Sequence, residues 1–77
     1  MKSQIKIKLF ATLHEFEPPS PDNYSIEKGI SISELLEQLN LPQEKAKLIF
    51  INGIKADLDA TLTGGERVGI FPPVGGG

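Results

Sequence analysis

The sequence predicts an α+β domain of two layers, in which one helix packs across a single mixed sheet. Three observations support this fold class. Residues 4–10 alternate between apolar and polar side chains, residues 31–39 combine a helix-capping signal with one apolar stripe, and residues 48–51 and 66–71 have the composition of strands. Because 77 residues bury only a little over ~60% of their extended surface, we expect a small core.

The first strand is predicted by strict alternation over residues 4–10. Successive side chains of a strand point to opposite faces of the sheet. One face receives the apolar side chains Ile5, Ile7 and Leu9, and the other receives Gln4, Lys6, Lys8 and Phe10. We expect the first face to be buried, which leaves Phe10 as an aromatic side chain on the solvent side.

Residues 11–23 are predicted to form a loop, because they contain three prolines together with Asp22 and Asn23. A short second strand is predicted at residues 24–27, with Gly29 closing it. We expect this strand to pair antiparallel with the first.

The helix is predicted by a capping box, in which the Ser31 hydroxyl accepts from the N–H of Glu34 and the Glu34 side chain reaches back to Ser31. Its apolar residues follow helical spacing and fall on one face: Ile32, Leu35, Leu36 and Leu39. Asn40 and Pro42 are expected to end the helix. The apolar face has to be buried, and the alternating strands supply the matching layer.

A hairpin is predicted after the helix. Residues 48–51 are apolar on both faces, and Asn52-Gly53 is a strong hairpin signal, since both positions accept a positive φ. A short return strand is expected near residues 54–56.

The last strand is predicted at residues 66–71, after a loop in which Leu58 and Leu62 act as apolar plugs and Gly64-Gly65 forms a tight turn. Alternation places Val68 and Ile70 on one face. The other face receives Arg67, Gly69 and Phe71.

Composition excludes several kinds of function. Without cysteine there is no disulfide, no thiolate metal site and no cysteine nucleophile. A net charge of −2 argues against a nucleic-acid partner, and no apolar run is long enough to span a membrane, so we expect a cytoplasmic protein. We interpret His14 and the scattered acidic residues as solvated side chains, and expect no metal site.

Residues 72–77 are predicted to form a flexible tail on a folded body of residues 1–71. Pro72 and Pro73 stiffen the exit from the last strand. Val74 follows, and then come three residues without Cβ that could enter a narrow channel: Gly75, Gly76 and Gly77. At about 3.3–3.6 Å per residue, the tail would carry its terminal carboxylate roughly 20 Å from the body. A frayed chain end is the simpler interpretation, but the prolines favour a functional tail.

Motifs over nearly the whole chain resemble those of the ubiquitin-like sulfur carriers of the MoaD/ThiS family. The matching segments are residues 7–11, 31–39, 51–53, 62–68, 71–74 and 76–77. The Phe-Pro-Pro-Val segment makes the chain most similar to MoaD, the small subunit of molybdopterin synthase. Gly75 stands where that branch more often has Thr or Ala, a departure shared with thiamine carriers. The resemblance implies a β-grasp (ubiquitin-like) fold of four or five strands, in the order 2-1-5-3-4, with the first and last strands parallel.

The resemblance also implies a reaction for the tail. A partner of the ubiquitin-activating type would use ATP to adenylate the carboxylate of Gly77, and a persulfide donor enzyme would convert it to a thiocarboxylate for molybdopterin (molybdenum or tungsten cofactor) synthesis. The chain would bind no cofactor and catalyse nothing alone, and would pair with a synthase large subunit. The alternatives are a carrier for thiamine or another sulfur product, and a ubiquitin-like modifier joined through Gly77 to lysines.

The phase of the strands predicts where partners would bind. If the first and last strands are parallel neighbours, Phe10 and Phe71 lie together on the outer face of the sheet, near the start of the tail. The third strand adds Ile49 or Phe50, depending on its register. Such an apolar patch indicates an interaction surface, although a loop or a second copy of the chain could cover it instead. Cations would form its rim: Lys6, Lys8 and Arg67.

Overall fold

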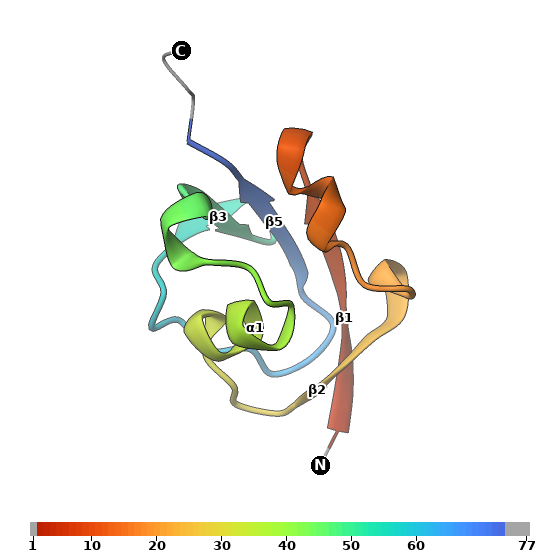
Figure 1. Ribbon diagram of the computed structural model, residues 1–77. Coiled ribbons are helices and arrows are strands. Elements are labelled where there is room, and N and C mark those ends of the chain that lie inside the picture. The colour runs from red at the N-terminus through yellow and green to blue at the C-terminus, as the bar shows by residue number, and fades with distance from the viewer. Residues whose placement is uncertain (1, 74–77) are drawn as a thin grey trace.

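The computed structural model describes residues 2–73, which form a five-stranded sheet with one α-helix packed against it (Figure 1). The strands are β1 (Lys2–Leu9), β2 (Tyr24–Glu27), β3 (Leu48–Ile51), β4 (Ile54–Ala56) and β5 (Arg67–Phe71). Their order across the sheet is β2-β1-β5-β3-β4. β1 and β5 are parallel, and the other neighbouring pairs are antiparallel. The predicted mixed sheet and its order are confirmed, with β5 in the centre.

The helix, α1 (Ile32–Gln38), begins and ends as its sequence predicts. The Ser31 hydroxyl accepts from the Glu34 N–H at 3.1 Å, and the Glu34 carboxylate accepts from the Ser31 N–H at 3.0 Å. After the last turn, Asn40 has a φ of 59°, a left-handed conformation that cannot continue the helix. The predicted capping box at the start of α1 and the predicted end of α1 at Asn40 are both present.

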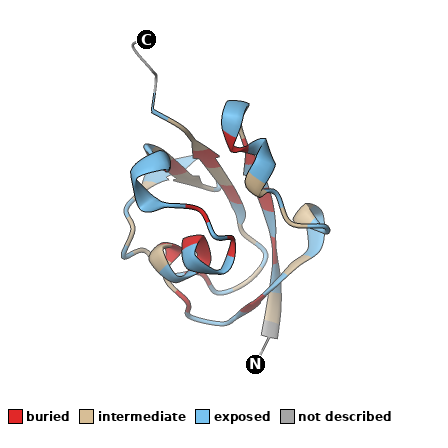
Figure 2. Cartoon of the chain, viewed as in Figure 1, coloured by how far each residue is buried: buried red, intermediate tan, exposed pale blue. Residues whose placement is uncertain are grey.

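The core lies between α1 and the inner face of the sheet. Figure 2 shows its buried positions along β1, β5 and α1. The predicted apolar face of the two central strands is buried: Ile5, Ile7, Leu9, Val68 and Ile70. The helix stripe is buried as well: Ile32, Leu35, Leu36 and Leu39. Alternation in the strands and helical spacing in α1 thus identify the two surfaces that meet.

The segment between β1 and β2 differs from the predicted loop. It contains two 3₁₀ turns, η1 (Ala11–Phe16) and η2 (Pro21–Asn23). Leu13, in η1, is buried and belongs to the core. A 3₁₀ turn repeats every three residues, so Leu13 and Phe16 share one side of η1. That short apolar signal was overridden in the prediction by the prolines that follow it.

A third 3₁₀ turn, η3 (Gln43–Lys45), follows α1. Among residues 2–73, no helix has the length and apolar character needed to cross a membrane.

The β3–β4 hairpin forms as predicted and also holds β5. Asn52 and Gly53 have φ values of 53° and 82°. The Asn52 N–H donates to the Arg67 carbonyl at 2.8 Å, and the Arg67 N–H donates to Asn52 Oδ1 at 2.9 Å. This reciprocal pair fixes the start of β5 beside the hairpin.

The chain from residue 57 to residue 66 connects β4 to β5. Leu62 is buried and Leu58 packs partly against the core, so both predicted plugs are confirmed. Gly64 approaches β1 so closely that a Cβ there would lie 2.6 Å from the Ser3 Cβ. The turn at this point therefore needs glycine.

Glu66 closes that turn through its side chain. Its carboxylate accepts from the N–H of Thr63 at 2.8 Å and from the N–H of Gly64 at 2.7 Å. Partial burial raises the pKa of Glu66, but these two bonds, with a third from the Thr63 hydroxyl, hold it below its usual range. The turn thus stabilises the ionised carboxylate.

Candidate functional site

The outer face of the sheet, opposite α1, gathers the side chains that alternation places there. Across β1 and β5, Lys6 pairs with Arg67 and Lys8 pairs with Gly69. Across β3 and β5, Phe50 pairs with Gly69 and Leu48 pairs with Phe71. Residues directly opposite in a pair share a face, so three adjacent strands contribute to one surface.

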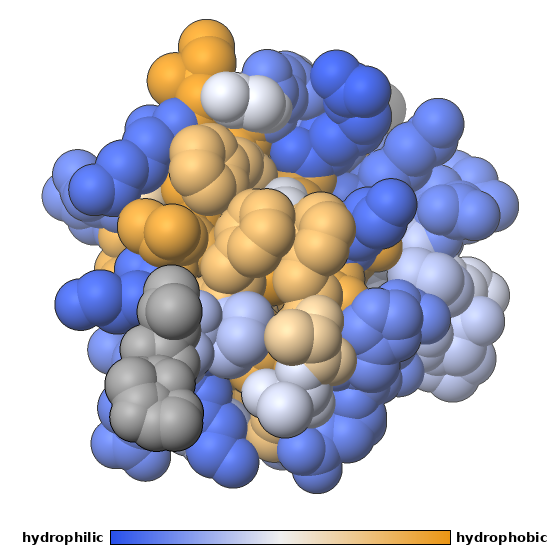
Figure 3. Space-filling view, turned by 90° about the horizontal axis from the view of Figure 1, so that it is seen from above, coloured by the Kyte–Doolittle hydropathy of each residue, from blue (hydrophilic) through white to orange (hydrophobic). Residues whose placement is uncertain are grey.

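An aromatic cluster of Phe10, Phe50 and Phe71 lies at the end of this face toward which β5 runs. The rings of Phe10 and Phe71 stack, with centroids 4.0 Å apart and planes 4° apart. Phe50 meets Phe71 edge to face, with centroids 5.7 Å apart. Figure 3 views this end of the molecule and shows an apolar patch surrounded by mostly hydrophilic residues. The predicted meeting of Phe10 and Phe71 on the outer face is confirmed.

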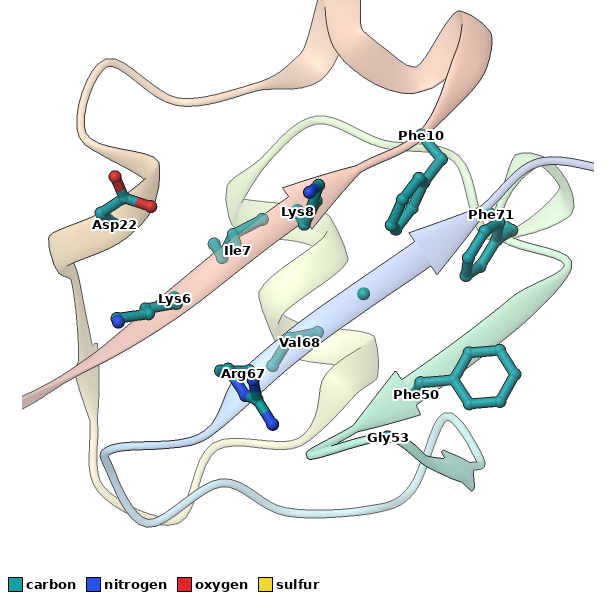
Figure 4. A pocket seen from close by; sticks show the side chains of 11 residues that line it. Lys6, Ile7, Lys8, Phe10, Asp22, Phe50, Gly53, Arg67, Val68 and Phe71 are labelled. Atoms are coloured by element: carbon teal, nitrogen blue, oxygen red, sulfur yellow. The ribbon is translucent and has the colours of Figure 1, made fainter.

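Beside the aromatic cluster lies an open hollow of about 600 Å³, called here the outer hollow (Figure 4). Its described lining includes the three phenylalanines, Gly69, three cations and one carboxylate; the charged residues are Lys6, Lys8, Arg67 and Asp22. Figure 4 shows Lys6 and Arg67 at the end of the hollow away from Phe10 and Phe71. The Nζ of Lys8 lies 5.6 Å from the centre of the Phe10 ring. An apolar end and a cationic end thus adjoin.

The register of β3 decides between Ile49 and Phe50. Ile49 pairs with Ile70 on the inner face, and its side chain is 4% exposed. Ile49 therefore faces the core, and of the two alternatives the one that placed Ile49 on the outer face is wrong. Phe50 is the outward residue.

Two outer-face residues were missing from the predicted docking set, Leu48 and Gly69. Leu48 is half-buried opposite Phe71, and Gly69 lies between Lys8 and Phe50. Alternation through Phe50 and Phe71 identifies both once the strand order is known. Gly69 has no side chain, so a search for apolar or charged groups overlooks it.

The root of the predicted tail is held on both sides. The Phe10 N–H donates to the Ile70 carbonyl at 3.1 Å, and the Lys47 N–H donates to the Phe71 carbonyl at 2.9 Å. Pro72 and Pro73 then line a smaller hollow of about 180 Å³ against η1 and Lys45. The chain is therefore fixed up to Phe71.

The remaining predicted tail residues lie outside the described residues: Val74, Gly75, Gly76 and Gly77. Among residues 2–73, no three His, Asp or Glu side chains are grouped so that they could hold a metal ion. What the described surface offers is a face that is both apolar and cationic beside Phe71, where the predicted tail begins.

The chain has relatives among known proteins. The sequence pattern of the ThiS family matches residues 7–77. No match is found among curated proteins. Of the solved structures, the HVO 2177 protein of Haloferax volcanii superposes with a TM-score of 0.77 at 19% identity, over 99% of this chain and 88% of that one.

Two further structures bear on the fold. SAMP1 of Haloferax volcanii superposes with a TM-score of 0.67 at 20% identity, over 97% of this chain and 100% of that one. A Pyrococcus furiosus protein assigned as molybdopterin converting factor, subunit 1, gives a TM-score of 0.64 at 27% identity, over 94% of this chain and 99% of that one. These likenesses establish the ubiquitin-like β-grasp fold that the sequence predicts.

Proposed function

The chain belongs to the ThiS family, and from this premise we propose that it is a sulfur carrier with a thiocarboxylate on Gly77. The family match supports the proposal because it runs from β1 through Gly77 and so includes residues 72–77. The structural observation that carries it is the position of β5. This strand lies in the centre of the sheet and ends at the aromatic cluster, so the residues after Phe71 start beside a docking surface.

The proposed reaction begins on an activating enzyme. An oxygen of the Gly77 carboxylate attacks the α-phosphorus of ATP. The bond from that phosphorus to the oxygen that bridges the α- and β-phosphates breaks, and pyrophosphate is released. The product is an acyl adenylate on Gly77. A persulfide sulfur of a donor enzyme then attacks the acyl carbon and displaces AMP. A thiol cleaves the resulting acyl disulfide, which leaves the thiocarboxylate on Gly77 and oxidises the thiol to a disulfide.

In this reaction the carrier contributes delivery rather than catalysis. The activating enzyme binds the ATP, and the carrier binds no cofactor of its own. Its folded body docks on the activating enzyme and so holds the tail near the bound ATP. The reaction of the carboxylate with ATP then becomes effectively unimolecular. Because the proposed reaction consumes ATP and needs a persulfide donor, we propose that the carrier works in the cytoplasm.

The decisive test measures the intact mass of the protein after incubation with a ubiquitin-activating-type enzyme, ATP and a persulfide donor. We expect the mass gain that corresponds to replacement of one oxygen by sulfur. The variant that lacks Gly77 should show no gain, whereas Lys28→Gln, in the exposed turn after β2 and outside the lining of the outer hollow, should react like the wild type. No gain in the wild type with an activating enzyme known to be competent would refute the proposal.

The docking role of the aromatic cluster has its own test. Phe71→Asp places a charge between Phe10 and Phe50, where an apolar partner surface would have to desolvate it. We expect the affinity for the activating enzyme to fall at least about tenfold. Unchanged affinity in a folded variant would refute a docking role for Phe71.

We propose that the sulfur goes to molybdopterin synthesis, with this chain as the small subunit of the synthase. The Phe71-Pro72-Pro73-Val74 segment supports this branch, as does the likeness to the Pyrococcus furiosus protein. The test is reconstitution: the thiocarboxylated chain, mixed with a synthase large subunit and the sulfur-free precursor, should yield molybdopterin. Product formation with a thiamine-pathway acceptor instead would assign the chain to the other branch.

A protein modifier is the second candidate, favoured by the likeness to SAMP1, the small archaeal modifier protein 1 of Haloferax volcanii. A modifier would leave an amide bond between the Gly77 carbonyl and a lysine of another protein. Mass spectrometry of the tagged chain recovered from cells would find such linkages if this candidate holds. Recovery of the free thiocarboxylate without conjugates would favour the carrier.

A further inference from the structure

The two edges of the sheet differ in what covers them. β2 lies at one edge and β4 at the other. At the β2 edge, the Tyr24 hydroxyl donates to Gln38 Oε1 of α1 at 2.9 Å, and Ile26 is buried. At the β4 edge, Ile54 is 73% exposed, and no other large apolar side chain among residues 2–73 is exposed. Because an edge strand is a template for pairing with another chain, β4 is the edge where a second chain would find an apolar contact.

The backbone of Lys55 points toward the open edge of β4. The Asn52 N–H donates to β5, and successive residues of a strand direct their backbone groups to opposite sides. Ile51 therefore directs its groups away from β5, to its partner Ile54. One residue further along β4, the N–H and C=O of Lys55 point away from β3. Asp57 follows two residues later and has the same phase.

Side chains along this edge alternate between the two faces of the sheet. Lys55 lies opposite Phe50 and therefore on the outer face, which places its neighbour Ile54 on the inner face. Continued alternation places Asp57 on the outer face and Leu58 on the inner face. Burial agrees, because Asp57 is exposed and Leu58 packs partly against the core. The edge thus carries a cation and an anion on one face and two apolar side chains on the other.

This arrangement is complementary to itself. In an antiparallel pair of two β4 strands with a two-fold axis at Ala56, Lys55 of each copy lies opposite Asp57 of the other. Ile54 of each copy then lies opposite Leu58 of the other. Opposite charges directly across two strands stabilise the pair, and like charges destabilise it, so an axis at Lys55, which would oppose two lysines, is disfavoured.

The backbone phase allows the same register. Lys55 and Asp57, which both point outward, would exchange their N–H and C=O groups as a hydrogen-bonded pair. The Asp57 carbonyl already accepts one hydrogen bond within its own turn, at 3.1 Å, and a carbonyl oxygen can accept a second. Charges, apolar side chains and backbone groups therefore all match in one register.

We propose that two copies of this chain form a dimer through this edge, with β4 paired to β4 about a two-fold axis at Ala56. The pairing joins the two five-stranded sheets and covers the exposed Ile54 of each copy. No residue of β4 is among the described residues that line the outer hollow, so the dimer leaves that face accessible and goes beyond the proposed function. Because the contact involves only a few residues of each copy, the dissociation constant is roughly 0.1–1 mM.

Charge exchange tests the register. Sedimentation velocity of the whole chain, over roughly a hundredfold range of concentration around that constant, measures dimerisation. Lys55→Glu opposes a carboxylate to Asp57 of the other copy, and Asp57→Lys opposes an ammonium group to Lys55. Each should raise the dissociation constant at least about tenfold. An equimolar mixture of the two variants should dimerise again, because every opposed pair then has opposite charges. Lys28→Glu makes the same charge change in the turn after β2 and should dimerise like the wild type.

The apolar contact has a separate variant. Ile54→Thr keeps a β-branched side chain and should change the stability of the monomer little, because Ile54 is mostly exposed there. It should nevertheless raise the dissociation constant severalfold, since the contact with Leu58 of the other copy is lost. Circular dichroism establishes that each variant folds.

Several results would overturn the proposal. One is a wild type that stays monomeric over the whole range, and another is a dimer that folded Lys55→Glu and Ile54→Thr leave unchanged. A third is a mixture of folded Lys55→Glu and Asp57→Lys that does not dimerise. A dimer that Phe71→Asp dissociates and Lys55→Glu does not would assign the contact to the outer face instead. If Asp57→Lys does not fold, Lys55→Glu compared with Lys28→Glu decides. None of these results depends on sulfur transfer, so they leave the proposed function untouched.

Discussion

Substitutions of Asn52 measure how firmly the β3–β4 hairpin holds the central strand. Asn52 does two things at once: it adopts a left-handed φ of 53°, and its Oδ1 accepts from the Arg67 N–H at 2.9 Å. Three substitutions separate these contributions. Alanine loses both, glycine keeps the backbone freedom but loses the acceptor, and aspartate keeps an acceptor and tolerates the left-handed region.

The expected magnitudes follow from these two contributions. The left-handed conformation costs alanine about 1 kcal/mol, and loss of the hydrogen bond to Arg67 costs about 1 kcal/mol more. Asn52→Ala should therefore lower the free energy of unfolding by about 2 kcal/mol. Asn52→Gly should lower it by about 1 kcal/mol, and Asn52→Asp by less than about 0.5 kcal/mol.

Urea unfolding followed by circular dichroism measures the series. We expect the midpoints to fall in the order Asp, Gly, Ala while the m-value stays constant. For a domain of this size, the thermal midpoint of Asn52→Ala should fall by roughly 8–16 °C. If Asn52→Ala were no less stable than Asn52→Gly, the positive φ would carry no cost. If Asn52→Gly were as stable as the wild type, the side-chain bond from Asn52 to β5 would contribute nothing.

Substitutions at three further sites test other parts of the fold. Ser31→Ala removes the helix cap and should lower the free energy of unfolding by about 1 kcal/mol in urea titrations; Ser31→Asp, which keeps an acceptor, should not. Leu36→Ala leaves a cavity under α1 and should lower it by about 2–5 kcal/mol, a loss that Leu36→Met should largely avoid. Because the folded protein holds the pKa of Glu66 low, the wild type should be more stable than Glu66→Gln above about pH 4.3 and lose this advantage as the pH falls further. Equal urea midpoints at pH 7 would contradict that linkage.

Most of the fold was predictable because its signals are local and strong. Strict alternation in β1, the capping box at Ser31 and the Asn52-Gly53 turn each fix a conformation within a few residues. The strand order was different. Nothing local pairs β1 with β5, since their contact joins the two ends of the described chain, and only the resemblance to a known family supplied it.

The residues of the outer face were predictable in part, because strand alternation is also a local signal. Alternation placed Phe10 and Phe71 on the outer face. All four residues of β3 are apolar, so their pattern does not show whether Ile49 or Phe50 faces outward. The register with β5 resolves them. Leu13 in η1 was missed because the prolines that follow this short segment indicated a loop. Gly69 was placed on the outer face but left out of the predicted docking set, because it has no side chain.

The central position of β5 also determines how the domain bears tension. Hydrogen-bonded ladders to β1 and β3 run along both sides of this strand. A pull on the chain beyond Pro73 acts along the strand axis and strains both ladders in shear, so that many bonds resist at once. An enzyme that pulls on that end should therefore load the hydrogen bonds of both ladders together, instead of breaking them one pair at a time.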